Sequence, residues 1–257
     1  MNSKTKRFNR IIKDIKSVKI QGATNIAKAS LTAYSLFPTG VSKKKLLSAR
    51  PTEPMMEKVL ELAEKTKDYK KILLHFEEAQ DRINKKGFGL IKRNDVVFTH
   101  CHSTNVIKAL IYAHKHKKKF EVYNTETRPL FQGRKTAREL RKAGIKVTMF
   151  VDSAVGIAMS KEQGTKKVDK VFLGADAITK KGVINKVGSE VIAKLARQEK
   201  IPVYIVGDSW KFTDKKIPTE QREIDEVWDR APKGVRIKNP SFEFVDKKYI
   251  TKIITEK

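Results

Sequence analysis

Residues 96–110 read VVFTHCHSTNVIKAL, and the pattern changes twice within this stretch. The apolar run 96–99 ends at the polar cluster 100–102, after which residues 103–105, Ser-Thr-Asn, precede apolar residues at helical spacing. This order predicts a buried strand, a turn and a helix, because serine, threonine and asparagine are typical of helix N-termini. The only cysteine in the chain, Cys101, lies in the turn.

The alternation of strand and helix continues toward the C-terminus. Candidate strands lie at 95–99, 120–124, 146–152, 169–175 and 202–208, and candidate helices at 105–116, 134–143 and 189–199. Alternating strands and helices predict an α/β fold with a parallel sheet. Ligands of such sheets bind beyond the carboxyl ends of the strands, so the polar residues that follow each strand are candidate site residues.

The first ninety residues have a different texture, with apolar residues three and four positions apart. These residues are Phe8, Ile11, Ile12, Ile15 and Val18 in one stretch, and Met56, Val59, Leu60 and Ala63 in another. The spacing predicts helices with one buried face. Short apolar runs replace this pattern after Gly87 and Gly89. We therefore predict a helical domain over 1–88 and an α/β domain over 89–257.

The chain has 257 residues and is strongly basic, with 56 Lys and Arg against 29 Asp and Glu and a net charge of +27. The lysines are scattered, and the densest run, 115–119, contains no aromatic residue on which a base could stack. This distribution disfavours a nucleic-acid-binding module and favours attraction of phosphorylated small molecules.

One cysteine excludes a disulfide framework within the chain. No segment has the charged start, apolar middle and small-residue cleavage site of a signal peptide, or the roughly 20 apolar residues of a membrane-spanning helix. We expect a cytoplasmic protein without a membrane partner.

Cys101 has two interpretations. The backbone N–H groups at a helix N-terminus lower the pKa of a nearby thiol and bind phosphate oxygens, so the turn could both bind and react. A lone cysteine is also commonly a small buried apolar residue. A zinc site made by the contiguous residues 100–102 is disfavoured, because zinc ligands are usually separated by two or more residues.

Asp176 follows the apolar run 171–173 and two small residues. Burial at a strand end would raise the pKa of its carboxyl and suit it to donate or accept a proton, whereas the alternative is an N-cap. For Asp152 and Asp208, which also follow strands, capping is the preferred interpretation. Four further clusters suggest two phosphate subsites: the glycine turn 21–24, the segment 50–52, the pair Asn185-Lys186 in a loop, and Lys211 in a loop.

Seven segments resemble one known superfamily: KIQGATNIA (19–27), SARPTEP (48–54), THCHSTNV (99–106), ETRPLFQGRKTARELRKAGIKVTMFVDSAV (126–155), VFLGADAI (171–178), VINKVGSEVIA (183–193) and KNPSFEFVD (238–246). This superfamily joins the α, β and δ subunits of translation initiation factor 2B with methylthioribose-1-phosphate isomerase and the archaeal ribose-1,5-bisphosphate isomerase. The resemblance implies a helical domain followed by a Rossmann-like parallel-sheet domain. It also implies a homo-oligomer, either a dimer or a hexamer built of dimers.

The resemblance also implies roles for individual residues. The isomerase branches use an acid/base pair that falls on Cys101 and Asp176, and they need no metal or cofactor. Substrate contacts fall on Gly22, Ala23, Thr24, Arg50, Ser103, Thr104, Asn105, Asn185, Lys186 and Lys211. Gln21 departs from the pattern, since the isomerase branches usually have arginine there.

We therefore expect an aldose–ketose isomerase that converts ribose 1,5-bisphosphate to ribulose 1,5-bisphosphate in nucleotide salvage. One alternative is a regulatory protein like those of initiation factor 2B, which would bind the α subunit of initiation factor 2. Regulatory subunits generally lack the cysteine and aspartate pair, so Cys101 and Asp176 favour an enzyme. The second alternative is a methylthioribose-1-phosphate isomerase.

Overall fold

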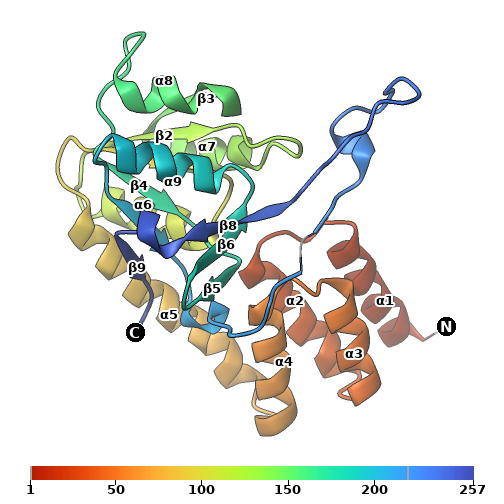
Figure 1. Ribbon diagram of the computed structural model, residues 1–257. Coiled ribbons are helices and arrows are strands. Elements are labelled where there is room, and N and C mark those ends of the chain that lie inside the picture. The colour runs from red at the N-terminus through yellow and green to blue at the C-terminus, as the bar shows by residue number, and fades with distance from the viewer. Residues whose placement is uncertain (1, 219) are drawn as a thin grey trace.

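Five helices form the N-terminal part of the computed structural model, which describes residues 2–218 and 220–257 (Figure 1). They are α1 (Ser3–Lys16), α2 (Ala23–Leu36), α3 (Gly40–Ala49), α4 (Pro54–Thr66) and α5 (Tyr69–Leu90). The periodicity in α4 is confirmed, since Met56, Val59, Leu60 and Ala63 are all buried. No helix in the described residues combines the length and apolar character needed to cross a membrane.

Six parallel strands form the main sheet, and all five predicted strands belong to it. In the order β3-β2-β1-β4-β7-β9 they are Lys146–Phe150, Glu121–Thr125, Val96–Thr99, Lys170–Leu173, Val203–Val206 and Lys252–Ile254. The pairings of neighbouring strands are all parallel. The predicted α/β class is therefore confirmed, and β9 is a strand that the sequence analysis missed.

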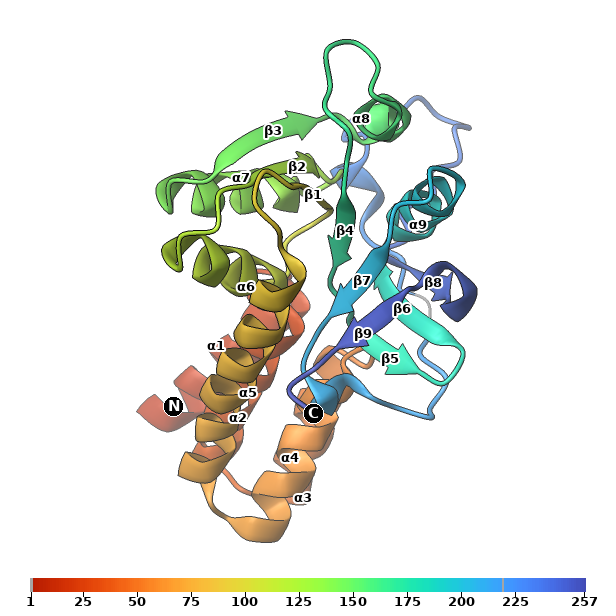
Figure 2. The same cartoon turned by 90° about the vertical axis from the view of Figure 1, so that its left-hand side faces the viewer.

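Helices cover both faces of this sheet. The remaining helices are α6 (Thr104–Lys115), α7 (Gln132–Lys142), α8 (Val155–Ser160) and α9 (Ser189–Gln198). On β1, Val96 and Phe98 pack with α8 and α9, whereas Val97 packs with α5, α6 and α7. This alternation follows from the two-residue period of a strand, and Figure 2 shows α6 and α7 on the opposite side of the sheet from α9.

The strand order reverses at β1. From β1 the chain proceeds to β2 and β3 on one side, and it then returns to β4, β7 and β9 on the other side. The ends of β1 and β4 lie side by side, with Thr99 paired to Phe172. Such a reversal point leaves a crevice beyond the carboxyl ends of the two strands, where ligands bind in sheets of this type. Cys101 and Asp176 follow these two strand ends.

A small antiparallel sheet lies beside the main one. It contains β5 (Ala177–Thr179), β6 (Gly182–Lys186) and β8 (Phe242–Asp246), in that order. Asn185 and Lys186 therefore end a strand and do not lie in a loop as predicted. Lys211 likewise ends the short 3-10 helix η2 (Ser209–Lys211). Residues 220–240, with the short helix η3 (Ile224–Glu226), project away from the sheet as a long loop (Figure 1).

Helix α5 connects the helical part to the sheet. Gly87 and Gly89, which suggested a domain boundary, lie in its last turns. Ile72 and Phe76 pack with the N-terminal helices, whereas Ile83 packs with β1 and α6. The division into 1–88 and 89–257 stays a prediction, because one continuous helix contributes to both cores.

Candidate active site

A cavity of about 100 Å³ lies where the strand order reverses. Its lining includes all twelve residues that the sequence analysis named: Gly22, Ala23, Thr24, Arg50, Cys101, Ser103, Thr104, Asn105, Asp176, Asn185, Lys186 and Lys211. These residues come from segments up to 189 positions apart, Gly22 and Lys211 being the extremes. The fold therefore brings the candidates together in one place, and their individual roles stay predictions.

The backbone of Cys101 is held in an unusual conformation. Its φ angle of 62° is left-handed, which is uncommon for residues other than glycine and often marks a functional turn. The Cys101 N–H donates to Thr127 Oγ1 at 3.0 Å, and the Cys101 carbonyl accepts from Thr136 Oγ1 at 2.7 Å. The side chain is partly exposed and lines the cavity. Cys101 is also outside the three clusters of buried apolar residues in the described chain, which disfavours the small-core interpretation.

Burial raises the pKa of the Cys101 thiol to about 11. Lys186 and the backbone N–H of His102 oppose this rise, and the carboxylates of Asp176 and Asp152 add to it. The groups at the helix N-terminus therefore do not give Cys101 a lowered pKa, because the lost solvation of the thiolate outweighs the favourable groups around it. Cys101 is therefore a neutral thiol at pH 7 in this structure.

His100 and His102 are held by neighbouring segments. His100 Nδ1 lies 2.5 Å from Thr125 Oγ1, and its Nε2 lies 2.9 Å from the Val187 carbonyl oxygen. His102 Nδ1 lies 3.1 Å from Thr136 Oγ1. Burial lowers the pKa of both histidines to about 4. Both rings are therefore neutral hydrogen-bonding groups that fix the turn around Cys101.

Asp176 lines the cavity just after the end of β4, where the chain packs closely against the start of α6. A Cβ atom on Gly174 would lie 2.7 Å from both Ser103 Cβ and Ser103 Oγ, so only glycine lets the end of β4 approach the start of α6 this closely. The Asp176 N–H donates to the Ile184 carbonyl at 2.9 Å. Because the next element is β5, Asp176 is not a helix N-cap. Burial raises the pKa of its carboxyl, while Lys211, Arg50 and Lys186 oppose the rise.

Asp152 and Asp208, which also follow strands, do not line the cavity but hold the turns beside it. Asp152 accepts from the N–H groups of Thr127 at 2.8 Å and Arg128 at 2.6 Å, so it fixes the turn behind Cys101. It does not cap η1 (Asp152–Ala154) as predicted. Asp208 does cap, since it accepts from Trp210 N–H at 2.8 Å at the start of η2.

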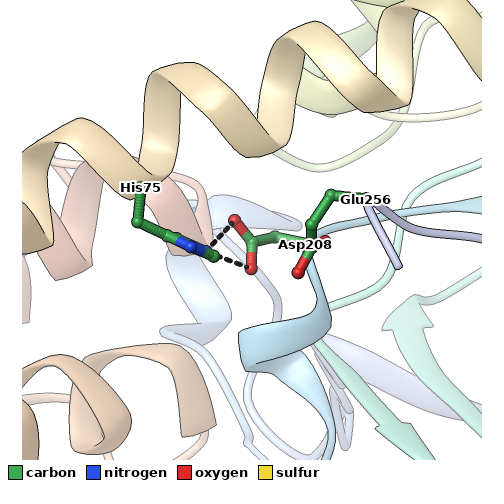
Figure 3. A group of neighbouring side chains, drawn as sticks. All are labelled: His75, Asp208 and Glu256. Atoms are coloured by element: carbon green, nitrogen blue, oxygen red, sulfur yellow. Dashed lines mark hydrogen bonds and ion pairs between the residues drawn. The ribbon is translucent and has the colours of Figure 1, made fainter.

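Asp208 also belongs to a buried group beside α5, shown in Figure 3. His75 Nε2 lies 3.1 Å from both carboxyl oxygens of Asp208, and the His75 ring stacks on Trp210 with a centroid separation of 3.5 Å. Glu256 accepts from Ser209 N–H at 2.9 Å. His75, Asp208 and Glu256 are close enough to hold a metal ion together. The hydrogen bonds account for the clustering of these three side chains without a metal ion. They attach η2, and with it Lys211, to α5.

Two helices begin at the cavity. Gly22 precedes α2 with a φ angle of 83°, a conformation that suits glycine, and no side chain caps the first turn of α2 in the structure as described. At the start of α6, Ser103 Oγ accepts from Val106 N–H at 3.5 Å. Unpaired N–H groups at helix N-termini are typical binding sites for phosphate oxygens.

Three buried cations add positive charge to the same cavity: Arg50, Lys186 and Lys211. Arg50 pairs with Glu220 at 3.2 Å, and Lys211 Nζ donates to the Ala175 carbonyl at 2.6 Å and to Asn105 Oδ1 at 3.4 Å. Buried cations are rare unless they bind a partner of opposite charge. The cavity is therefore suited to an anionic ligand with more than one charged group.

Sequence reasoning missed several polar residues of the lining. These are Glu53, Gln132, Lys135, Arg222 and Glu226. Glu53 stands three positions after Arg50 and directly before the proline that begins α4, so its place at a helix start was a usable signal. Arg222 and Glu226 form an ion pair at i, i+4 spacing, but their loop has no periodic pattern that would place it over the cavity.

Comparison with known proteins shows which family this sequence matches. Residues 6–257 match the model of the Initiation factor 2 subunit family. The chain is similar to the ribose 1,5-bisphosphate isomerase of Methanocaldococcus jannaschii, at 34% identity over 94% of this chain and 87% of that protein. It is also similar to the methylthioribose-1-phosphate isomerase of Fervidobacterium nodosum, at 33% identity over 99% of this chain and 75% of that protein.

A solved structure shares the whole fold. The translation initiation factor eIF-2B of Pyrococcus horikoshii OT3 superposes with a TM-score of 0.83 at 27% identity, covering 97% of this chain and 95% of that one. The family match and both relatives thus extend over nearly all of the helical part, the sheet and the cavity. On these grounds the chain belongs to the Initiation factor 2 subunit family.

Proposed function

We propose that this chain is an aldose–ketose isomerase that converts ribose 1,5-bisphosphate to ribulose 1,5-bisphosphate. The observation that carries the proposal is that Cys101 and Asp176 open onto one cavity beside three buried cations. The resemblance assigns these two residues to the acid/base pair, and the similarity to a protein named ribose 1,5-bisphosphate isomerase supports the substrate. Nucleotide salvage is the pathway implied by that resemblance.

Ring opening is the first chemical problem. The anomeric oxygen carries a phosphate, so the sugar ring cannot open spontaneously to an aldehyde. In the proposed step the minor, ionised form of Cys101 takes the proton from C2, the electron pair forms a C1–C2 double bond, and the bond from C1 to the ring oxygen breaks. Asp176, whose pKa burial raises, donates its proton to the departing ring oxygen. The product is an open-chain enol phosphate.

The ketose then forms by return of the proton. Asp176, now ionised, accepts the proton of the C2 hydroxyl, and Cys101 delivers its proton to C1. C2 becomes the ketone carbon, C1 becomes a CH₂ group that still carries its phosphate, and both side chains regain their starting states. No electron leaves the substrate, so the two residues suffice for the proton transfers.

The charges of the cavity favour a bisphosphate. A substrate with two phosphates requires two anion subsites, and the cavity has two helix N-termini together with Arg50, Lys186 and Lys211. A methylthio group would instead require an apolar pocket at C5. Methylthioribose 1-phosphate is the second candidate because of the 33% identical relative of that name.

A regulatory role in translation initiation is the third candidate, favoured by the shared fold with the eIF-2B structure. Binding to initiation factor 2 would not require a thiol and a carboxyl that line the same cavity. Assembly into a homo-oligomer stays a prediction that accompanies either role.

Proton NMR of purified protein with ribose 1,5-bisphosphate tests the proposal. We expect the C1 proton signal to disappear and ketose signals to appear, and we expect Cys101→Ser to abolish this conversion. Methylthioribose 1-phosphate in a parallel tube should react more slowly. Faster conversion of the methylthio compound would reverse the substrate assignment, and no conversion of either sugar would favour the regulatory role.

A further inference from the structure

Three residues that line the cavity have a buried polar atom without a hydrogen-bond partner among the described residues. One of these atoms is Oε1 of Gln132, and the remaining two lie on a single turn. One is Oε2 of Glu53, whose residue is 3% exposed, and the other is Nε of Arg50, whose residue is 8% exposed. Glu53 precedes α4 and Arg50 follows α3, so the short turn 50–53 carries both. Leaving such groups unpaired costs about 1–3 kcal/mol each, which makes a ligand between them the simplest explanation.

We propose that Glu53 contacts the substrate, and that in its protonated form it donates a hydrogen bond to a phosphate oxygen bound by Arg50. This inference rests on the proposed function, since it assigns a further residue to the same substrate. Nothing in the reaction described above uses Glu53, so its role is in binding.

Four charged groups act on Glu53. Arg50 and Lys211 are the cations, and Asp176 and Glu220 are the carboxylates. A second ionised carboxylate beside Asp176 would repel both Asp176 and an incoming phosphate. Burial, followed by the charge of Asp176, raises the pKa of Glu53 to about 8. The neutral acid is therefore the predominant form at pH 7.

The protonation state of Glu53 determines which kind of ligand atom can bind here. Arg50 Nε can only donate a hydrogen bond, and a protonated Glu53 can also donate one. An oxygen that accepts both bonds must have several free lone pairs, as a phosphate oxygen does. Phosphate in turn stabilises the proton on Glu53, because ionising that carboxyl would put two anions in contact.

This arrangement links binding to proton uptake. If the bisphosphate binds only when Glu53 is protonated, a pKa of about 8 predicts a dissociation constant about tenfold larger at pH 9 than at pH 7. The phosphate groups are already dianionic at pH 7, and lysine and arginine remain charged at pH 9, so neither contributes to this change.

Calorimetry of ribose 1,5-bisphosphate binding to Cys101→Ser, which should not turn the sugar over, measures the linkage. Four proteins are compared at pH 7 and pH 9: this background alone, and with Glu53→Gln, Glu53→Met or Asp176→Asn added. Glutamine keeps a neutral donor at every pH, whereas methionine keeps the size and removes the donor. Thermal unfolding of each variant confirms that it folds.

We expect a ratio of dissociation constants near ten in the background and below about two in Glu53→Gln. The ratio should be larger than ten in Asp176→Asn, because loss of the Asp176 carboxylate lowers the pKa of Glu53. Glu53→Met should bind at least about fivefold more weakly than Glu53→Gln at pH 7. A ratio that persists in Glu53→Gln and disappears in Asp176→Asn would assign the proton to Asp176 and overturn the proposal. No measurable binding at pH 7 would overturn it as well.

Different results would refute the isomerase assignment and the role of Glu53. Wild-type protein that binds the bisphosphate with the expected pH dependence, but does not convert it, would refute the isomerase and leave Glu53 as a phosphate contact. Conversion with a pH-independent dissociation constant would refute the role of Glu53 alone.

Discussion

Arg50 and Glu220 form an ion pair of 3.2 Å that joins the helical part of the chain to the long loop after η2. Glu220 also accepts a hydrogen bond from Thr52 Oγ1 at 3.1 Å, so one carboxylate contacts two positions of the same turn. Arg50 is a candidate phosphate ligand, and its guanidinium is already engaged by an anion. A substrate phosphate at the unpaired Arg50 Nε would therefore share the guanidinium with Glu220 and be repelled by its charge.

Glu220→Gln should tighten substrate binding and weaken the fold. Removing the carboxylate frees the Arg50 guanidinium, and a charged hydrogen bond is worth about 1.5–3 kcal/mol, so we expect the dissociation constant to fall several-fold. The melting temperature should fall too, because a buried cation loses its partner. Glu64→Gln is the control, since Glu64 pairs with Lys43 and does not line the cavity. Weaker binding in Glu220→Gln would show that Glu220 orients Arg50 for the phosphate.

Cys101→Ser should lower turnover by at least about two orders of magnitude while leaving the fold intact. The turn is fixed by Thr127 and Thr136, which bond to backbone atoms of Cys101 and not to its side chain. Turnover by NMR and the melting temperature, measured on the same preparation, separate the two effects. A variant with the wild-type rate would remove Cys101 from the mechanism.

The turnover number should rise with pH. The pKa of the thiol is about 11, so its thiolate fraction increases about tenfold per unit between pH 7 and pH 9. Saturating substrate keeps the protonation of Glu53 from affecting the result. Lys186 is the cation that most lowers the thiol pKa, so Lys186→Met should reduce the turnover number throughout this range. A flat profile would mean either that proton removal by the thiol does not limit the rate or that Asp176 loses its proton over the same pH range.

The sequence predicted the main sheet well because its central strands are buried runs of Val, Ile, Leu and Phe. It missed β5, β6 and β8, which are only three to five residues long, and β6 ends in the polar cavity residues Asn185 and Lys186. The twelve candidate residues meet because the strand order reverses at β1, a property of topology that local patterns do not encode. The raised pKa of Cys101 was missed for a similar reason. It depends on burial by segments distant in the chain.

Asp176→Asn should abolish turnover and change the dissociation constant by less than about tenfold. Asparagine keeps the size of the side chain but cannot protonate the ring oxygen. The bond from the Asp176 N–H to the Ile184 carbonyl, 2.9 Å, involves only the backbone and should survive the substitution. Calorimetry and turnover on the same variant test both parts. A collapse of binding would make Asp176 a structural residue of the cavity.

Lys211→Met should raise the KM for ribose 1,5-bisphosphate by about tenfold or more. The ammonium group is buried and lines the cavity, and a charged contact to phosphate is worth about 1.5–3 kcal/mol. Methionine has a similar length and no charge. The turnover number should also fall, because Lys211 Nζ bonds to the carbonyl of Ala175, the residue next to Asp176.

The same substitution should discriminate between substrates. On a ribose 1-phosphate without the 5-phosphate we expect only the fall in turnover number, since the lost charge has no phosphate to contact there. Lys180→Met is the matched control, because it removes one positive charge from a side chain that is 87% exposed. Equal increases in KM on both substrates would show that Lys211 does not recognise the 5-phosphate. An unchanged turnover number would show that the Asp176 turn keeps its position without the bond from Lys211 to Ala175.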